Sequence, residues 1–150
     1  MNVIIEIGKL KERKALKVLD FGCGLKKLKP FIKNYTGYDI DSRFTEIKDW
    51  RDVEFDVVIA NAVFMYMTEN ELKIFIKQLY KHNSNVELIF ATTRQNIITK
   101  TFKFITGQLK GYADVKLSYR DQLYILTRHF RIINKITIFG LNDVYLMKFK

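Results

Sequence analysis

The feature that most restricts how this chain can fold is a glycine turn placed directly after a short apolar run. Residues 18–21 read Val-Leu-Asp-Phe, and Gly22 and Gly24 follow at once. Such a run suits a strand covered on both faces, and glycine lets another group approach the backbone closely. A second predicted strand, 35–40, carries Asp39 near its end. A glycine turn after one strand and an acid after the next is how open α/β sheets hold a ribose-bearing cofactor.

The rest of the chain alternates helical and strand patterns in the order that an α/β sheet requires. Thr68 and Glu71 form a capping-box signal for one helix, and Ser118 is a cap for another. Gly140 lies in a turn between two final apolar runs, which indicates a hairpin. The predicted strands cover 16–21, 35–40, 55–60, 86–91, 130–137 and 144–149. The predicted helices cover 2–14, 25–34, 69–82 and 118–129, and the second of these would turn Leu25, Leu28, Phe31 and Ile32 inward.

Three motifs in this order resemble those of class I S-adenosylmethionine (SAM)-dependent methyltransferases. They are Asp-Phe-Gly-Cys-Gly at 20–24, Gly-Tyr-Asp at 37–39, and Phe-Asp-Val-Val-Ile-Ala-Asn-Ala-Val-Phe-Met-Tyr-Met at 55–67. The close match covers about residues 16–95. The resemblance implies a single α/β domain over residues 1–150, with a Rossmann-like, mostly parallel sheet flanked by helices and a C-terminal antiparallel strand pair. It also implies SAM as cofactor and S-adenosylhomocysteine (SAH) as product.

The resemblance assigns most cofactor contacts to the ends of the first two predicted strands. Asp39 would bind the ribose hydroxyls, because an ionised carboxylate can accept two hydrogen bonds. Asp20 would face the methionyl amino group. The N–H groups of a helix after Gly24 would receive the methionyl carboxylate. The candidate cofactor-binding residues in this part of the chain are Asp20, Gly22, Cys23, Gly24, Asp39 and Ile40.

Further candidates follow the third and fourth strands of the family. Asp49 resembles the acid that receives the adenine amino group, and Trp50 either flanks the adenine ring or belongs to the core. Asn61 ends the strand beside the methionyl part. Tyr66, at a position where many relatives have histidine, is the one catalytic candidate, as a residue that orients the substrate. No metal site is expected, since the histidines and the cysteine have no zinc-like spacing.

The chain departs from the family at two places. Lys26 stands where many relatives carry a third glycine, and residues 41–54 are too short for both a helix and a strand. We therefore expect a sheet trimmed around the third strand, with residues 45–48 as a stub of it. Residues 92–118 follow no strand pattern, and we interpret them as an insertion that covers the substrate.

Charge and composition restrict the partners and the compartment. The net charge is +10, but residues 35–93 hold six basic residues and ten acids, so the positive charge lies in the two flanks. A basic flank suits an anionic partner. The single cysteine fits a reducing compartment, and the chain shows neither a signal peptide nor a membrane span, so we expect a cytoplasmic protein.

The sequence therefore predicts methyl transfer from SAM to an unidentified acceptor. A small or amphiphilic anionic molecule is favoured, because the 92–118 segment combines an apolar stripe with lysines. Two alternatives stay open. One is an RNA methyltransferase or nucleic-acid-binding module, and the other is a non-catalytic subunit that kept the fold and supports a partner enzyme. The oligomeric state is not predicted.

Overall fold

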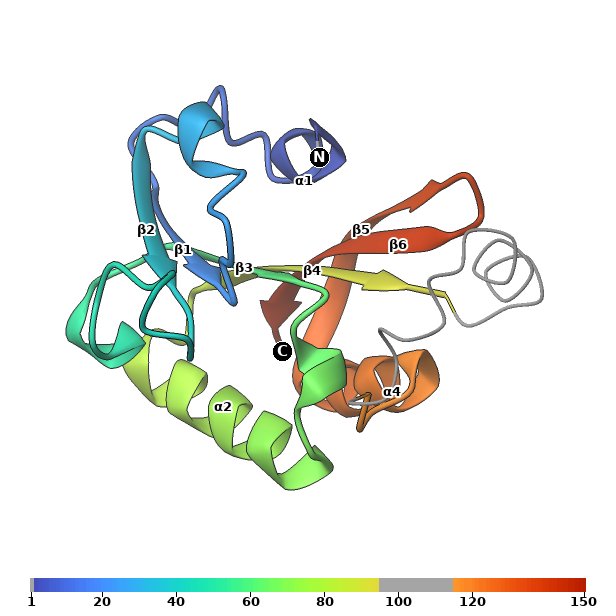
Figure 1. Ribbon diagram of the computed structural model, residues 1–150. Coiled ribbons are helices and arrows are strands. Elements are labelled where there is room, and N and C mark those ends of the chain that lie inside the picture. The colour runs from blue at the N-terminus through green and yellow to red at the C-terminus, as the bar shows by residue number, and fades with distance from the viewer. Residues whose placement is uncertain (1, 95–114) are drawn as a thin grey trace.

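The computed structural model describes residues 2–94 and 115–150, and in these ranges it forms a six-stranded sheet with helices on both faces (Figure 1). The predicted 92–118 insertion lies mostly outside the described residues. The helices are α1 (Asn2–Ile7), α2 (Glu69–His82) and α4 (Tyr119–His129), with 3-10 turns η1 (Lys29–Phe31), η2 (Trp50–Asp52) and η3 (Phe64–Tyr66). The strands are β1 (Lys17–Phe21), β2 (Asn34–Tyr38), β3 (Val57–Asn61), β4 (Glu87–Thr93), β5 (Phe130–Ile138) and β6 (Asn142–Phe149).

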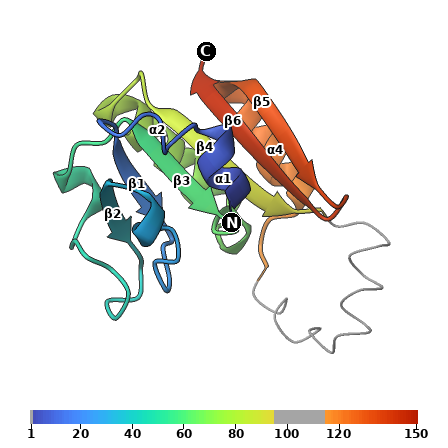
Figure 2. The same cartoon turned by 90° about the horizontal axis from the view of Figure 1, so that it is seen from above.

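The sheet has the order β2-β1-β3-β4-β6-β5, and it confirms the predicted fold class. The first four strands in this order run parallel, whereas β6 pairs antiparallel with both β4 and β5. Figures 1 and 2 show α1 on one face of the sheet and α2 with α4 on the other. The C-terminal ends of β1, β2, β3 and β4 therefore meet at one edge, where ligands bind in open α/β sheets.

Side chains of the central strands are buried on both faces, as the unbroken apolar runs predict. Val58 and Ala60 of β3 belong to the core under α2 and α4, while Val57 and Ile59 belong to the core under α1. All four are fully buried. Because successive strand residues point to opposite faces, each parallel strand contributes to both layers.

The capping signals place two helices as expected. The Thr68 side chain accepts a hydrogen bond from the Glu71 N–H, and the Glu71 carboxylate accepts one from the Thr68 N–H, which completes the capping box of α2. Ser118 caps α4 with its side-chain oxygen, which accepts a hydrogen bond from the Asp121 N–H. Among the residues that the structure describes, no helix has both the length and the apolar character needed to cross a membrane.

The predicted helix over 25–34 is wrong. This segment forms turns and the short η1, with hydrogen bonds to the third residue back, such as Phe31 N–H to the Leu28 carbonyl at 3.0 Å. Lys26 has a left-handed backbone, with φ of 52°. Pro30 has no N–H to offer an α-helix and would clash with the carbonyl four residues earlier. Leu28 and Ile32 are buried as predicted, but Leu25 and Phe31 are exposed.

Two other boundaries also differ from the prediction. The N-terminal helix ends at Ile7 rather than near residue 14, because Lys9 adopts a left-handed backbone with φ of 49°, a common way for a helix to end. The sheet is trimmed around the family's third strand, as expected, but residues 45–48 form bends rather than a strand stub. Glu46 nevertheless contacts the free edge of β2, because its N–H and carboxylate both hydrogen-bond the Gly37 backbone.

Lys26→Gly should stabilise the protein by up to about 1 kcal/mol. A left-handed backbone costs a non-glycine residue about 1–2 kcal/mol, whereas a new glycine costs roughly 0.4–1 kcal/mol through the unfolded chain. The substitution also removes an ion pair to Glu46 with atoms 3.8 Å apart, which we expect to contribute little. Urea denaturation measures the difference. The control is Lys27→Gly, at a neighbour without a positive φ, which should be destabilising; a Lys26 variant that loses as much would contradict the strain argument.

Candidate functional site

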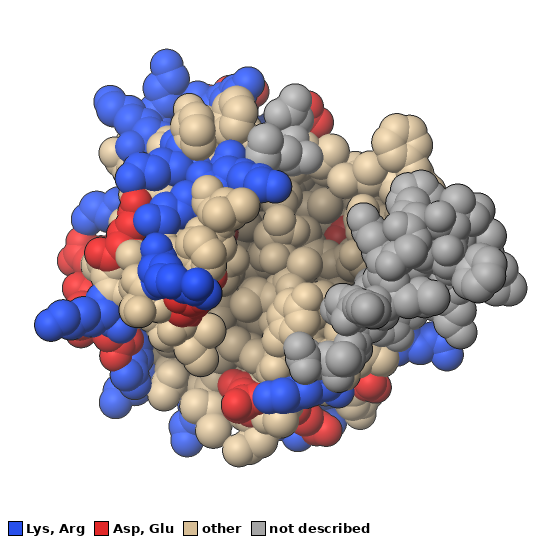
Figure 3. Space-filling model, viewed as in Figure 1, with Lys and Arg blue, Asp and Glu red and all other residues tan. Residues whose placement is uncertain are grey.

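The candidate site is a cavity of about 530 Å³ over the C-terminal ends of β1, β2 and β3, on the α2 face of the sheet. Figure 3 shows a hollow in this region, between α1 and α2, whose floor is mostly uncharged and whose rim carries Lys and Arg side chains along part of its length. Five of the predicted site residues line the cavity, namely Gly22, Asp39, Ile40, Asn61 and Tyr66. The remaining lining residues are Phe21, Tyr38, Ala62, Val63, Met67, Glu71 and Lys116.

The floor of the cavity depends on the backbone of Gly22. Its φ is +75°, and a Cβ built there would lie 2.5 Å from Cγ2 of Val63 in the loop after β3. The N–H groups of Gly22 and Cys23 both donate to the Tyr38 carbonyl, at 2.8 and 3.1 Å. The turn is thereby held against the end of β2, and no side chain at position 22 separates it from the next loop.

Asp39 occupies the mouth of the cavity with its carboxylate oriented by backbone donors. One oxygen accepts the Gly24 N–H at 2.9 Å, and the other accepts the Asp41 N–H at 3.0 Å. Each carboxylate oxygen has two lone pairs, so each can accept one more hydrogen bond. The paired hydroxyls of a ribose supply two such donors, so the geometry of Asp39 fits the role predicted for it.

Asp20 and Cys23 lie behind the glycine turn rather than on the cavity. Asp20 is buried and accepts the Tyr35 hydroxyl at 2.8 Å. Burial, with a smaller contribution from the charge of Asp39, raises the pKa of Asp20 to about 6. Burial and the same two carboxylates raise the pKa of the Cys23 thiol to about 11, so the thiol stays protonated at neutral pH. Cys23, predicted to bind the cofactor, is thus a small buried residue that is not among those lining the cavity.

Asp49 and Trp50 are not among the described residues that line the cavity. Asp49 pairs with Arg51, whose side-chain hydrogen bonds lower the pKa of that carboxyl to about 2. Trp50 is buried against Phe21 and Phe75. Trp50 is thus packed in the core, as one of its two interpretations expects, and its role beside the adenine ring stays a prediction.

Asn61 ends β3, Ala62 follows it, and both border the cavity. Asn61 pairs in register with Ala91 of β4, and the Ala62 N–H donates to the Ala91 carbonyl at 2.8 Å. Ala62 has a left-handed backbone with φ of 56°, an unfavourable conformation for alanine. Such strain is often found at functional sites. Tyr66, in η3, is about half exposed and reaches the same cavity.

The part of the cavity wall that follows η3 contains two residues that the sequence did not indicate as site residues. Glu71, assigned only to the helix cap, also lines the cavity, and so does Lys116, whose N–H donates to the Met65 carbonyl at 2.8 Å. No local pattern links residues 65 and 116. The available signal was the position of Glu71 in the first turn of a helix that begins beside the strand ends.

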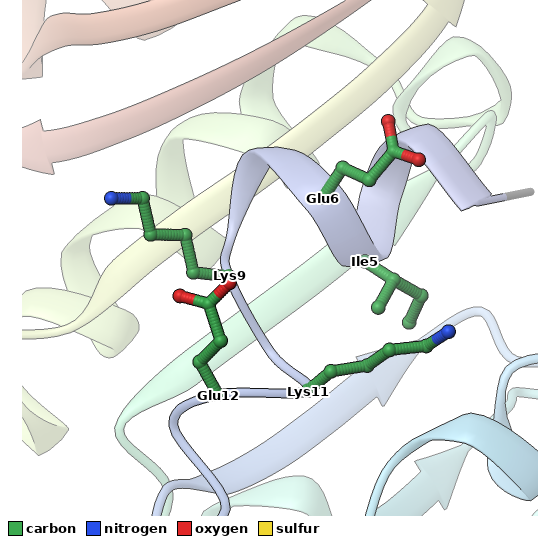
Figure 4. Close-up of a pocket in the computed structure, with 5 residues that line it drawn as sticks. All are labelled: Ile5, Glu6, Lys9, Lys11 and Glu12. Atoms are coloured by element: carbon green, nitrogen blue, oxygen red, sulfur yellow. The ribbon is translucent and has the colours of Figure 1, made fainter.

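Two smaller cavities lie on the α1 side. One, of about 290 Å³, touches the first cavity at Asn61 and Ala62. The other, of about 330 Å³, is lined by Ile5, Glu6, Lys9, Lys11 and Glu12 (Figure 4). In Figure 4 the side chains of this last cavity fan outward around the turn after α1 instead of converging on one point. It shares no residue with the candidate site, and we assign it no function.

Gly22→Ala should destabilise the protein more than Gly24→Ala. Both positions have positive φ, which costs alanine about 1–2 kcal/mol. A Cβ at Gly22 also meets Val63, whereas one at Gly24 meets none of the described residues within 4 Å. The difference between the two free energies of unfolding, from urea denaturation, measures the contact with Val63. If both variants lose the same free energy of unfolding, the loop after β3 can move away from residue 22 without destabilising the protein.

Asp20→Asn should become relatively more stable than the parent protein as the pH rises. The native state binds the Asp20 proton more tightly than the unfolded chain does, so the parent protein loses stability between about pH 4 and pH 6. A shift of about two pKa units corresponds to roughly 2–3 kcal/mol. Denaturation at pH 4 and at pH 7 tests this, with the exposed Asp52→Asn as control. A difference that does not change with pH would mean that Asp20 titrates normally.

Comparisons with known proteins agree with this geometry at the level of the fold. No family model matches the chain, and no curated protein matches its sequence. Among solved structures, the PH0226 protein of Pyrococcus horikoshii aligns with a TM-score of 0.69 and 14% identity, over 99% of this chain and 89% of that one. A putative type 11 methyltransferase from Sulfolobus solfataricus aligns with a TM-score of 0.68 and 15% identity, over 96% and 89% of the two chains.

A third solved structure contains SAH. The N-methyltransferase NodS of Bradyrhizobium japonicum, in complex with SAH, aligns with a TM-score of 0.62 and 16% identity, over 99% of this chain and 86% of that one. At such low identities the likeness establishes the fold and leaves the activity to be argued from the site. The chain has the Rossmann-like fold of class I SAM-dependent methyltransferases, as its three motifs predict.

Proposed function

We propose that this chain is a SAM-dependent methyltransferase that binds its cofactor in the 530 Å³ cavity. The observation that carries the proposal is the Asp39 carboxylate, held by the N–H groups of Gly24 and Asp41 at the mouth of that cavity. The shared fold supports it, since SAM-dependent methyltransferases are among the structures with this fold and one of them holds SAH.

The residues present fit the adenosine part of SAM. Asp39 would accept the two ribose hydroxyls, and Gly22 leaves the backbone open to close approach. Ile40, which is almost fully exposed, and Met67 supply apolar surface at the rim for the adenine ring. The absence of a helix after Gly24 removes the helix N-terminus that the sequence analysis had assigned to the methionyl carboxylate. Asp20, buried behind the turn, would not touch the methionyl end but would help to position the backbone beside it.

SAM, when bound, supplies a methyl group already activated by the positive sulfonium. The protein therefore has to bring the acceptor into line and exclude water, and a strong base is not required. Asn61 and Ala62 border the cavity where the methionyl end would reach, and Tyr66 beside them would orient the acceptor. A tyrosine is a poor general base at neutral pH, so its role is one of positioning.

We further propose a small or amphiphilic acceptor and a cytoplasmic location. The cavities at the strand ends are lined mainly by apolar and uncharged residues, which suits a compact organic molecule. The single cysteine is buried and unpaired, which suits a reducing compartment.

Adding SAH should raise the melting temperature of the protein, because a ligand that binds only the native state stabilises it. Asp39→Ala should weaken SAH binding about 10- to 100-fold, which corresponds to the roughly 1.5–3 kcal/mol of hydrogen bonds to a charged group. Isothermal titration calorimetry gives both affinities.

The matched control is Asp49→Ala, which removes another carboxylate that the resemblance assigns to the cofactor but that does not line the cavity. It should leave SAH affinity within about twofold. Unchanged affinity in Asp39→Ala would remove Asp39 from the site. If the parent protein fails to bind SAH at all, the proposed function is wrong.

A further inference from the structure

The second cavity, of about 290 Å³, lies on the opposite face of the sheet from the proposed cofactor site. Strand alternation puts the side chains of Asn61, Ala91 and Val144 on the α1 face, where Ala91 and Val144 pack in the core under α1. Ile4 of α1 forms the opposite wall, and Ile138 with Asn142 from the β5–β6 hairpin closes one side. The two cavities share Asn61 and Ala62, so they meet at the end of β3.

The lining of the second cavity is apolar apart from a few uncharged polar groups and one cation. Ile4, Leu28, Ala91 and Val144 are buried apolar residues on its walls. Lys27 is the one charged residue, and no carboxylate belongs to the described lining. An apolar body with a single negative group matches this arrangement, because an acid here would meet a cation and no opposing acid.

Lys27 also differs from the other lysines of its turn because its ammonium group is not paired with Glu46. Its neighbours Lys26 and Lys29 both pair with Glu46, at 3.8 and 2.6 Å. Lys27 is exposed and has no acidic partner in the described parts of the chain. A ligand carboxylate at the rim of the second cavity would therefore not compete with a protein carboxylate for this ammonium group.

We propose that the second cavity receives the methyl acceptor, a small apolar molecule with one carboxylate or similar anionic group, and that Lys27 selects it. The proposal rests on the proposed function. The first cavity is larger and holds Asp39, which leaves the second for the acceptor. The reacting end of the acceptor would reach past Asn61 and Ala62 into the first cavity, where it would meet the methyl group beside Tyr66. Its lone pair forms the bond to the methyl carbon, the carbon–sulfur electron pair returns to sulfur and gives neutral SAH, and any proton lost goes to solvent.

Octanoate and its neutral analogue octanamide are suitable probes, because they share an apolar chain and differ in charge. Calorimetry in saturating SAH should show that the parent protein binds octanoate more tightly than octanamide. Lys27→Met should weaken octanoate binding about tenfold or more, the lower range for a hydrogen bond to a charged group. Octanamide and SAH affinities should change less than about twofold. Lys27→Glu should weaken octanoate binding further, through repulsion.

The control is Lys33→Met, at an exposed lysine of the same segment that does not line the cavity. It should leave octanoate affinity unchanged. If Lys27→Met lowers SAH affinity tenfold, Lys27 binds the cofactor carboxylate and the acceptor assignment fails. Equal loss in the Lys27 and Lys33 variants, or no octanoate binding in the SAH-bound parent protein, also overturns it. Failure to bind SAH, by contrast, overturns the proposed function itself, whatever octanoate does.

Discussion

The site depends on the attachment of the turn after β1 to the end of β2. Two consecutive N–H groups, of Gly22 and Cys23, donate to the single carbonyl of Tyr38, and the next glycine N–H donates to Asp39. These bonds require the left-handed backbone that Gly22 and Gly24 adopt. They also fix the Asp39 carboxylate before any ligand arrives, which reduces the conformational entropy that binding would otherwise cost. The same turn therefore shapes the cavity and orients the Asp39 carboxylate, the main hydrogen-bond acceptor in it.

Trimming the sheet leaves β2 at an edge, and the segment after β2 protects that edge. The Glu46 N–H donates to the Gly37 carbonyl, and the Gly37 N–H donates to the Glu46 carboxylate. Burial of Glu46 opposes its charge, but the hydrogen bonds from Lys29 and Gly37 lower the pKa of this carboxyl below its ordinary value. One glutamate thus satisfies backbone groups that a third strand would pair, and it blocks further strand addition. The free edge of β2 is therefore protected although the chain lacks the family's third strand.

The sequence predicted the features that depend on local chemistry and long apolar runs. The four parallel strands, the caps of α2 and α4, and the C-terminal hairpin follow from such signals. The predicted helix over 25–34 has the apolar spacing of a helix, but Pro30 cannot donate within one, and Lys26 adopts a left-handed backbone where many relatives carry glycine. The depth of Trp50 and the contact of Lys116 with the site depend on tertiary packing, which no local pattern encodes.

A buried charge ties the β5–β6 hairpin, which lines the second cavity, to the segment after β4. Asp143 is fully buried next to Asn142, and it accepts hydrogen bonds from Arg94, Thr137 and Tyr119 at 2.6–2.8 Å. Burial alone would raise the pKa of Asp143, but these donors hold it far below its usual range. Removing any one donor would leave a buried carboxylate less well satisfied, which is costly. The wall that β5 and β6 contribute is therefore tied to the end of β4, and selection of the proposed acceptor would depend on the side chains that line the second cavity.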